Sequence, residues 1–364
     1  MADGQAALVA KVKVEGDARD ARRPAGTTAL ATRLGLKLVA SDALTIRRRK
    51  KGAGFSYVRP DGKSVDRATA KRLASLAVPP AYHDVLYAED PAAHLQAIGR
   101  DDAGRLQYRY HPEWEKVREM RKSRRLARLA EALPRIRRSV AQHLSADGPT
   151  RELALAGVIE LVARSAIRPG SESYARLRGT RGAATLLKSN VSVNGDTIVL
   201  SFRAKGGKKV TKEIIAARLC AAIEILKKLP GRRLFQYRNG DDAVRMVSAQ
   251  DVNVFLREIA DARISLKDFR TLLASVSVLQ ALTQETPATS KRARRRQVLE
   301  AIRTAADELA NTPTICGKSY VHEAVVNAFE EGTLEQFADT LRNCRSAARR
   351  EKILAEVLAT AAAA

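Results

Sequence analysis

The stretch Asn311-Thr-Pro-Thr-Ile-Cys-Gly-Lys-Ser-Tyr320 separates two segments in which apolar residues recur at helical spacing. The first of these segments covers residues 298–309 and predicts a helix. Asn311 and Pro313 predict the end of that helix, because proline disfavours its continuation. Tyr320 is therefore expected at the start of a second helix, just beyond a tight turn. By themselves these local residues favour an ordinary packing role for Tyr320.

Length and charge indicate the kind of partner. The chain has 364 residues, which is long enough for two domains. Its formal net charge is +25 and its isoelectric point is about 10.4, so we expect a polyanionic partner. Aromatic residues make up only 4% of the chain. This favours a surface for duplex phosphates over a base-stacking platform for single strands.

Cysteines and histidines are few and scattered. The three cysteines lie far apart, which suits a reducing compartment, and neither they nor the five histidines have a metal-ligand spacing. No apolar run reaches the length of a membrane span, and no signal-peptide core follows Met1. We therefore expect a cytoplasmic protein without a metal, a cofactor or a membrane partner.

Composition and periodicity divide the chain into three regions. Residues 1–40 lack a sustained period and predict a flexible basic tail, although their leucines could make a short helix. Residues 41–118 contain short alternating strands and turns, which predict a small β-rich domain. Residues 119–364 predict a mainly helical domain. The boundary falls in a basic helical segment, residues 116–138, with ten Lys or Arg against two acids.

The helical region also contains a small sheet. Residues 191–202 predict a hairpin with an Asn-Gly turn, and Val210 begins a third strand. The expected fold class is α+β, with a β-rich N-terminal domain before a mainly helical domain that carries a three-stranded sheet. The helices are predicted at residues 212–228, 248–260, 267–284 and 296–310. Residues 291–296 are expected to form a mobile basic connection.

Five residues in this region suit the breaking of a DNA backbone without a metal. An arginine binds two phosphate oxygens at once and stays charged, a lysine can donate a proton, and a tyrosine can hold a phosphodiester covalently. Arg168 follows a helix, Lys205 lies in the turn after the predicted hairpin, and Arg270 lies early in a helix. Asn311 and Tyr320 complete this set.

The motifs around these residues resemble those of the type IB DNA topoisomerases, specifically the small poxviral and bacterial group. The similar blocks are I-R-x-G-x-x-x-Y at 167–174, F-x-x-K-G at 202–206, K-D-x-R-T at 267–271 and the block 311–320. Upstream, residues 78–82 and 104–110 are similar to the N-terminal domain of that family. The resemblance covers about residues 45 to 345, and it rests on several motifs in family order.

The resemblance implies a fold like that of tyrosine recombinases and type IB topoisomerases, and a set of roles. Tyr320 would attack one strand of duplex DNA and form a 3′-phosphotyrosyl link. Arg168 and Arg270 would stabilise the developing charge, and Lys205 would protonate the departing 5′ oxygen. Asn311 would hold a non-bridging oxygen. The activity implied is relaxation of supercoils without ATP or metal, by a monomer that clamps double-stranded DNA. Many members have histidine at the position of Asn311, and an amide can donate the same hydrogen bond but carries no charge.

The same resemblance implies DNA contacts outside the catalytic set. These are Gln107, Tyr108, Tyr110, Tyr174 and Lys208. For Gln107 and the two neighbouring tyrosines, ordinary packing in a sheet is the alternative.

Two other classes of function remain open from the sequence. A tyrosine recombinase shares the catalytic logic, but its second-arginine box normally reads H-x-x-R, whereas Lys267 stands at the first position here. A non-enzymatic DNA-packaging protein would explain the charge. It would not explain why the motifs fall in family order.

Overall fold

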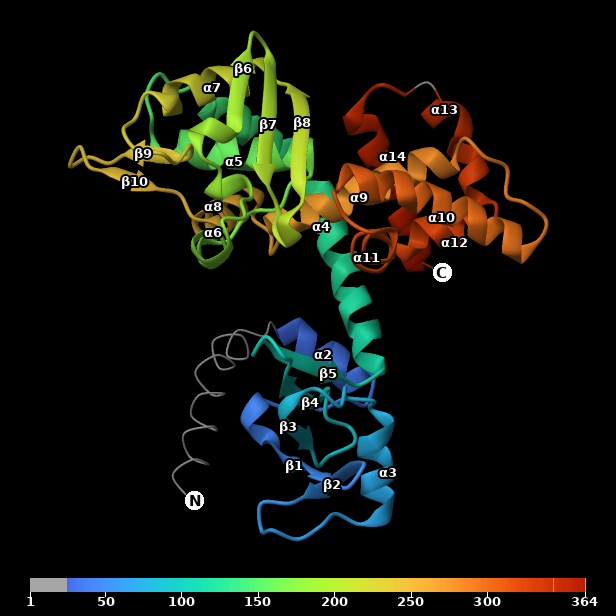
Figure 1. Cartoon of the computed structure of the whole chain (residues 1–364). Coiled ribbons are helices and arrows are strands. Elements are labelled where there is room, and N and C mark those ends of the chain that lie inside the picture. Colours follow the sequence, from blue (N-terminus) through green and yellow to red (C-terminus); the bar gives the residue numbers. More distant parts are fainter. Residues whose placement is uncertain (1–24, 343, 364) are drawn as a thin grey trace. The chain divides into compact units, whose positions relative to one another are not determined.

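The structure is a computed structural model that describes residues 25–342 and 344–363. The chain divides into two compact units, the first ending at Lys122 and the second beginning at Ser123. Helix α4 (Glu113–His143) crosses this boundary, and the expected boundary at residue 118 lies in the same helix. The first unit is built on a sheet, and the second unit is mainly helical (Figure 1).

The first unit contains a five-stranded sheet with the strand order β2-β1-β3-β4-β5, in which all neighbours are antiparallel. Its elements are α2 (Ala25–Arg33), β1 (Leu44–Lys51), β2 (Gly54–Val58), α3 (Arg67–Ser75), β3 (His83–Ala88), β4 (Leu95–Arg100) and β5 (Leu106–Tyr110). Apolar residues on the two faces of the sheet form separate clusters. One cluster includes Leu73 of α3, so this helix covers one face.

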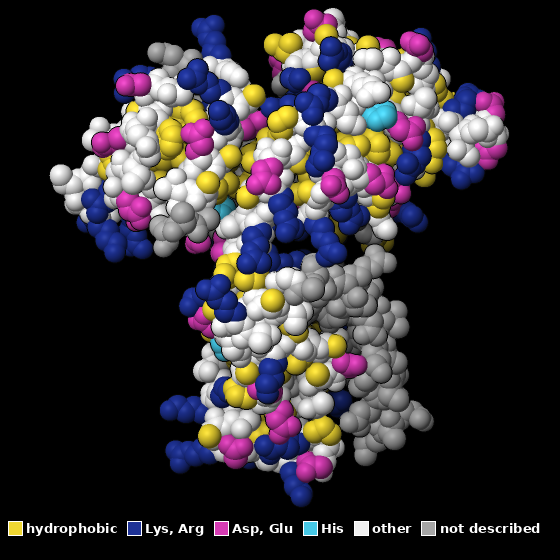
Figure 2. Space-filling view, turned by 180° about the vertical axis from the view of Figure 1, so that it is seen from behind, with side chains coloured by type: hydrophobic (Ala, Val, Ile, Leu, Met, Phe, Trp, Pro, Cys, Tyr) yellow, Lys and Arg dark blue, Asp and Glu magenta, His cyan; other side chains and the backbone are white. Residues whose placement is uncertain are grey.

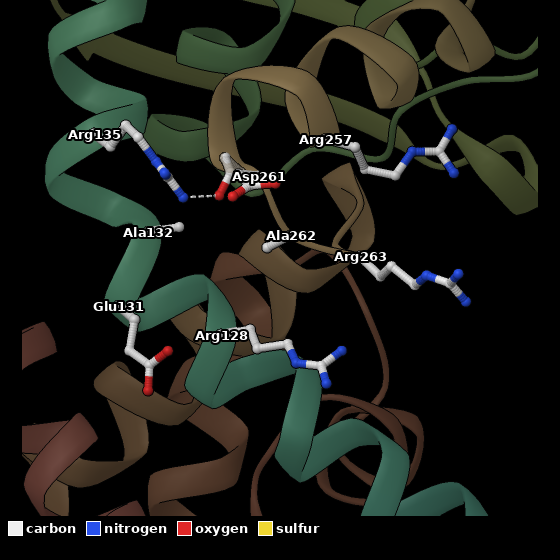
Figure 3. Close-up of a pocket in the computed structure, with 9 residues that line it drawn as sticks. Arg128, Glu131, Ala132, Arg135, Arg257, Asp261, Ala262 and Arg263 are labelled. Carbon is white, nitrogen blue, oxygen red and sulfur yellow. Dashed lines mark hydrogen bonds between the residues drawn. The ribbon is translucent and has the colours of Figure 1, made fainter. Parts of the chain in front are cut away.

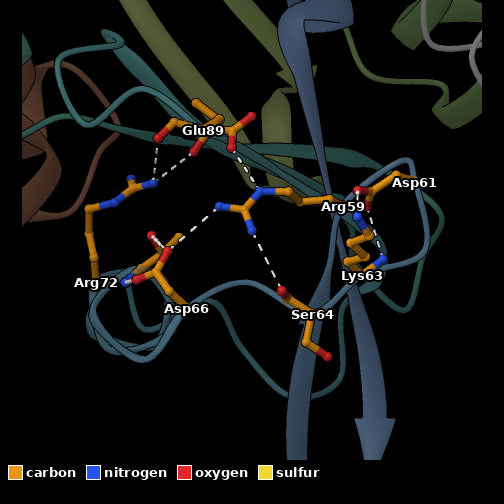
Figure 4. Close-up of polar contacts among 9 residues, drawn as sticks. Arg59, Asp61, Lys63, Ser64, Asp66, Arg72 and Glu89 are labelled. Atoms are coloured by element: carbon orange, nitrogen blue, oxygen red, sulfur yellow. Dashed lines mark hydrogen bonds and ion pairs between the residues drawn. The ribbon is translucent and has the colours of Figure 1, made fainter.

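A polar network ties β2, α3 and β3 together (Figure 4). Arg59 donates from Nε to Glu89 Oε1 at 2.9 Å and forms an ion pair with Asp66 at 3.6 Å. Arg72 of α3 donates to the carbonyl oxygen of Glu89 at 2.9 Å. Asp66 caps α3 by accepting from the backbone N–H of Thr69, and this bond, with a second one from the Thr69 hydroxyl, lowers the pKa of Asp66 to about 2. The network fixes the position of α3 against the sheet.

The expectation of a flexible tail up to residue 40 is wrong for residues 25–40. This segment contains α2, and Leu30 and Leu36 are buried against Trp114 and Val117 of α4. The apolar partners of the segment lie some 80 residues later in sequence, so its own composition could not reveal them. The first 24 residues lie outside the described part of the chain.

The second unit packs its helices and a three-stranded antiparallel sheet, β6-β7-β8, around one continuous core. The strands are β6 (Val191–Asn194), β7 (Thr197–Arg203), β8 (Lys209–Ile215), β9 (Gln236–Arg238) and β10 (Val244–Met246). The helices after α4 are α5 (Arg151–Ser165), α6 (Glu172–Arg178), α7 (Ala217–Lys227), α8 (Ala249–Ala260), α9 (Leu266–Leu282), α10 (Lys291–Glu308), α11 (Pro313–Ser319), α12 (Glu323–Glu330), α13 (Ala338–Arg342) and α14 (Ala347–Ala363). Helix α5 is buried along most of its length and contacts α7, α8 and α9. In the described ranges, no helix is long and apolar enough to cross a membrane.

Two expectations about helix boundaries in this unit are wrong. Residues 212–215 belong to β8, and α7 begins only at Ala217. Their pairing with β7 overrides the local helical pattern, because it satisfies the backbone of a strand whose alternate residues face the core. Residues 291–296 are not a mobile connection. They form the first turns of α10, where the side chain of Ser290 accepts from the N–H of Ala293.

The segment 311–320 is also more regular than the sequence predicts. It contains the short helix α11, which begins with Pro313 at its first position and has Thr312 as its N-cap. Tyr320 is the C-cap of α11, and α12 begins only at Glu323. The tyrosine therefore ends one helix and does not start the next.

Candidate active site

Arg168 follows directly on the end of α5. The helix ends at Ala166, which adopts a left-handed conformation with φ +56°. The backbone of Arg168 is fixed by a very close approach to Gly182, because a Cβ on Gly182 would lie 2.5 Å from the carbonyl oxygen of Arg168. The N–H of Ala183 donates to that same oxygen at 2.8 Å. These contacts position the Arg168 side chain.

Arg270 lies in the second turn of α9 and is only 1% exposed. Its guanidinium joins the ends of two other helices. Nη1 donates to the carbonyl oxygen of Ala166 at the end of α5, and Nη2 donates to that of Leu309 at the end of α10, at 3.2 Å. Both carbonyls lack a partner within their own helices, as is usual at a helix C-terminus. Arg270 thus holds three helices at one point.

Asn311 is presented by the C-terminal turn of α10. Ala310 has φ +49°, its N–H donates to Asp307 O, and the N–H of Asn311 donates to Ala306 O. This pair of bonds is a Schellman motif, with alanine in the left-handed position that glycine usually takes. The side-chain oxygen of Asn311 accepts from Nη2 of Arg168 at 2.6 Å.

Tyr320 lies beside these residues and is 9% exposed. The central guanidinium carbon of Arg270 is 4.8 Å from the centroid of its ring, and Nζ of Lys267 is 5.9 Å from that centroid. Burial acts to raise the pKa of Tyr320, but the positive charges of Arg270, Arg168 and Lys267 outweigh it. The pKa of Tyr320 is therefore lowered, which favours the phenolate needed for nucleophilic attack.

Two buried donors at this site have no hydrogen-bond partner among the described residues. They are Nε of Arg270 and Nδ2 of Asn311. A buried donor without a partner costs about 1–3 kcal/mol, so folded proteins rarely retain one without a reason. Together with Arg168, these donors suit an anion with several oxygens.

Lys205 lies in the turn between β7 and β8, where Gly206 and Gly207 have φ +80° and +77°. Its side chain is exposed and makes no hydrogen bond or ion pair to the described residues. The preceding residue, Ala204, lines a small pocket together with Arg168 and Arg270. The fold therefore brings Arg168, Arg270, Asn311 and Tyr320 together, whereas Lys205 is only next to their pocket in sequence.

The residues expected to touch DNA differ in exposure. Tyr174 on α6 is 46% exposed, with the guanidinium of Arg178 at 5.4 Å from its ring, and Lys208 is exposed in the β7–β8 turn. Tyr110 on the edge strand β5 is 39% exposed. Two others also have internal contacts: Gln107 donates to Asp101 at 2.8 Å, and Tyr108 packs against the sheet cluster.

Sequence reasoning missed two lysines that belong to this site. Lys267 lies over the ring of Tyr320, although the sequence predicted no role for it beyond its place in the K-D-x-R-T block. Lys212 lines the pocket with Arg168 and Arg270. In β8, Lys212 alternates with the buried residues Val210 and Ile214 and so lies on the same face as they do. This alternation could have identified Lys212 from the sequence, but residues 212–228 were predicted to be helical.

A larger open hollow of the helical unit lies between α4 and the α8–α9 connection (Figure 3). It is lined by Arg128, Arg135, Arg257 and Arg263, against the two acids Glu131 and Asp261. Three of the guanidinium groups, those of Arg128, Arg257 and Arg263, extend to the same side in Figure 3. Figure 2 shows many more Lys and Arg side chains on its face of this unit, with acids scattered among them. The surface suits a polyanion.

Metal-ligating side chains are not gathered anywhere in the part of the chain that the structure describes. No group of three or more His, Cys, Asp or Glu residues there could hold a metal ion.

Two family models and one relative of this chain all belong to DNA topoisomerases. Residues 111–348 match the family model of the eukaryotic DNA topoisomerase I catalytic core. Residues 54–101 match that of the bacterial DNA topoisomerase IB N-terminal domain. The chain is 29% identical over 293 residues to the DNA topoisomerase 1B of Acanthamoeba polyphaga mimivirus, across 78% of this chain and 87% of that protein.

Proposed function

Because this chain belongs to the DNA topoisomerase I family and is a type IB DNA topoisomerase, we propose that it relaxes supercoiled DNA through a covalent bond to Tyr320. One strand of duplex DNA is cut at a phosphodiester, the cut strand rotates, and the same strand is rejoined. The alternative of a non-enzymatic packaging protein is wrong, since the family is one of enzymes.

The observation that carries this proposal is the pair of buried donors beside the tyrosine that find no partner in the described part of the chain. Nε of Arg270 and Nδ2 of Asn311 need acceptors, and the non-bridging oxygens of a phosphodiester supply them. Arg168 adds a third donor group and is already bonded to Asn311. As Tyr320 attacks, negative charge grows on these oxygens, and donors fixed in advance stabilise the transition state most.

In the proposed cleavage step, the phenolic oxygen of Tyr320 attacks the phosphorus and its proton is lost. The bond from phosphorus to the 5′ oxygen breaks, which leaves a 3′-phosphotyrosyl link and a 5′-hydroxyl. The lowered pKa of Tyr320 helps the first proton to leave. Lys205, in the exposed turn one residue after the pocket-lining Ala204, supplies the proton to the 5′ oxygen.

Religation is the reverse of this step. One phosphoester is exchanged for another in each direction, so the covalent intermediate retains the energy of the backbone, and neither ATP nor a metal is needed. In this proposal, the β-rich unit and the helical unit bind one duplex as a monomeric clamp. Tyr174, Lys208, Gln107, Tyr108 and Tyr110 contact that duplex. The cell compartment proposed is the cytoplasm, at the bacterial nucleoid.

A plasmid assay tests the function. Supercoiled plasmid should be relaxed in EDTA without ATP, and denaturing gels should show a covalent adduct between protein and DNA. The Tyr320→Phe variant should form no adduct. An unchanged adduct from that variant would mean that another residue is the nucleophile. Strand exchange between two DNA sites without relaxation would favour the recombinase alternative.

A further inference from the structure

Lys212 is a lysine on the buried face of a strand. On β8 it lies between Val210 and Ile214, which are both buried, and it points to the same side of the sheet as they do. An apolar side chain would be the ordinary choice for this position. Lys212 is half-buried, and burial lowers the pKa of its amine, with Glu308 acting against this shift and Arg270 adding to it. Packing alone does not explain a cation here.

The Lys212 amine binds the end of α10. Its Nζ donates to the carbonyl oxygen of Glu308, the last residue of that helix. The next carbonyl, that of Leu309, accepts from Arg270. Two cations on different elements thus hold two consecutive carbonyls at the negative end of the helix dipole.

These two bonds complete the hydrogen bonding of the C-terminal turn. The carbonyls of Ala305, Ala306 and Asp307 accept from backbone N–H groups of residues 309–311. Those of Glu308 and Leu309 have no backbone donor among the described residues, and Lys212 and Arg270 take that place. The turn leads directly to Asn311.

We propose that Lys212 is a positioning residue for DNA cleavage, which holds the C-terminal turn of α10 so that Asn311 stays in hydrogen-bonding distance of the phosphate. The inference rests on the proposed function, because it assigns Asn311 to the phosphate. Lys212 acts on the reaction through the Glu308 carbonyl and does not transfer a proton. A displacement of about 1 Å at such a site costs on the order of 10²-fold in rate.

The test uses Lys212→Met, which keeps the length of the side chain and removes the donor. Cleavage is measured in a single turnover, as covalent adduct per unit time at saturating DNA. We expect cleavage to slow about 10- to 100-fold, with little change in the Kd for DNA. Lys212→Arg should restore most of the rate, since it returns a cationic donor. The matched control is Lys352→Met, an exposed lysine of α14, and it should cleave at the parent rate.

A double-mutant cycle separates positioning from general loss of structure. If Lys212 acts through Asn311, then the double variant should cleave no more slowly than Asn311→Ala alone, so Asn311→Ala should slow Lys212→Met by a smaller factor than it slows the parent. Rate losses that multiply would overturn the inference. Should Lys212→Met fail to fold, Lys212→Gln replaces it, because its amide nitrogen is uncharged and lies one bond closer to the backbone than the lysine amine.

A substrate with sulfur in place of the bridging 5′ oxygen excludes a role in proton transfer. A thiolate leaves without a proton, so loss of a general acid is repaired by this substrate, whereas loss of positioning is not. Lys212→Met should stay slow on the sulfur substrate, and recovery of its rate would overturn the inference. An adduct formed by Tyr320→Phe would defeat the proposed function itself. A parent rate for Lys212→Met, with Tyr320→Phe inactive, would defeat only this inference.

Discussion

Arg168 donates a 2.6 Å hydrogen bond from Nη2 to Oδ1 of Asn311, across 143 positions of sequence. A guanidinium can only donate, so this bond fixes which end of the amide faces the arginine. Nδ2 of Asn311 is thereby left as a donor for another group, and it has no partner among the described residues. This chain thus orients the amide of Asn311 with an arginine.

Three substitutions of Asn311 test this arrangement. Asn311→Ala should lower the rate of single-turnover cleavage about 10²–10³-fold, because one donor to the phosphate is lost. Asn311→Asp should be at least as slow, since it can still accept from Arg168 but has no donor and repels the phosphate. Asn311→His should retain most of the rate. Cleavage by the aspartate variant at the parent rate would show that Nδ2 does not serve the reaction.

Replacement of Arg270 should reduce both activity and stability. Arg270→Ala removes a donor to the phosphate and leaves the carbonyls of Ala166 and Leu309 without partners. We expect a loss of about 10²–10³-fold in cleavage rate. The free energy of unfolding should fall by about 1–3 kcal/mol, as measured by urea denaturation. The control is Arg303→Ala, which removes only an exposed ion pair with Glu300 and should change the stability by less than about 1 kcal/mol.

Ionisation of Tyr320 should depend on Lys267. The pKa of Tyr320 is lowered in the folded protein, so its ionised form contributes stability above the ordinary tyrosine pKa. This contribution is lost as the pH falls through the lowered value. Lys267→Met removes one of the charges that lower the pKa, and the midpoint should move to higher pH. Tyrosinate absorbance, taken as the difference between each protein and its Tyr320→Phe counterpart, measures the midpoint. A shift to lower pH would contradict the electrostatic explanation.

Gly182→Ala should displace the backbone of Arg168, which lies 14 positions earlier in the sequence. The added Cβ would lie 2.5 Å from the carbonyl oxygen of Arg168 and from the nitrogen of Gly170, so the backbone has to move. We expect a loss of about 1–3 kcal/mol in the free energy of unfolding and slower cleavage. Gly240→Ala is the matched control, because a Cβ there has no atom within 4 Å. Equal stability of the two variants would refute the steric interpretation.

The arginine-lined hollow should contribute to DNA affinity and not to the cleavage step. Arg128→Gln combined with Arg263→Gln should weaken binding and should lower the slope of log K against log salt by about one for each phosphate that the variant no longer neutralises. Filter binding over a range of salt concentrations measures this slope. Single-turnover cleavage at saturating DNA should stay at the parent rate. An unchanged slope would mean that the duplex does not reach the hollow.

Several features of the fold follow from local patterns in the sequence. The hairpin around Gly195 was predictable, because this glycine permits the positive φ of 57° that the turn needs. The turn residues are nevertheless Gly195 and Asp196, since Asn194 already belongs to β6 and pairs with Thr197. Helix α3 was predictable from Asp66 and the apolar spacing after it. In contrast, the sequence of the end of β8 is also compatible with a helix, and its pairing with β7 makes it a strand. The order of residues 25–40 likewise depends on burial of their leucines against α4, which the local sequence does not show.

For the site, the sequence by itself determined the identity of the arginines, the lysine, the asparagine and the tyrosine in the four motifs. The order of these motifs along the chain was enough to indicate the class of reaction. It placed Tyr320 next to a helix end but on the wrong helix, and it could not reveal that Lys212 and Arg270 hold the end of α10. Only the tertiary structure decided those contacts. The last carbonyls of a helix have no donor within the helix, and at the end of α10 two of them accept from side chains of β8 and α9. The local sequence pattern of α10 carries no information about these distant donors.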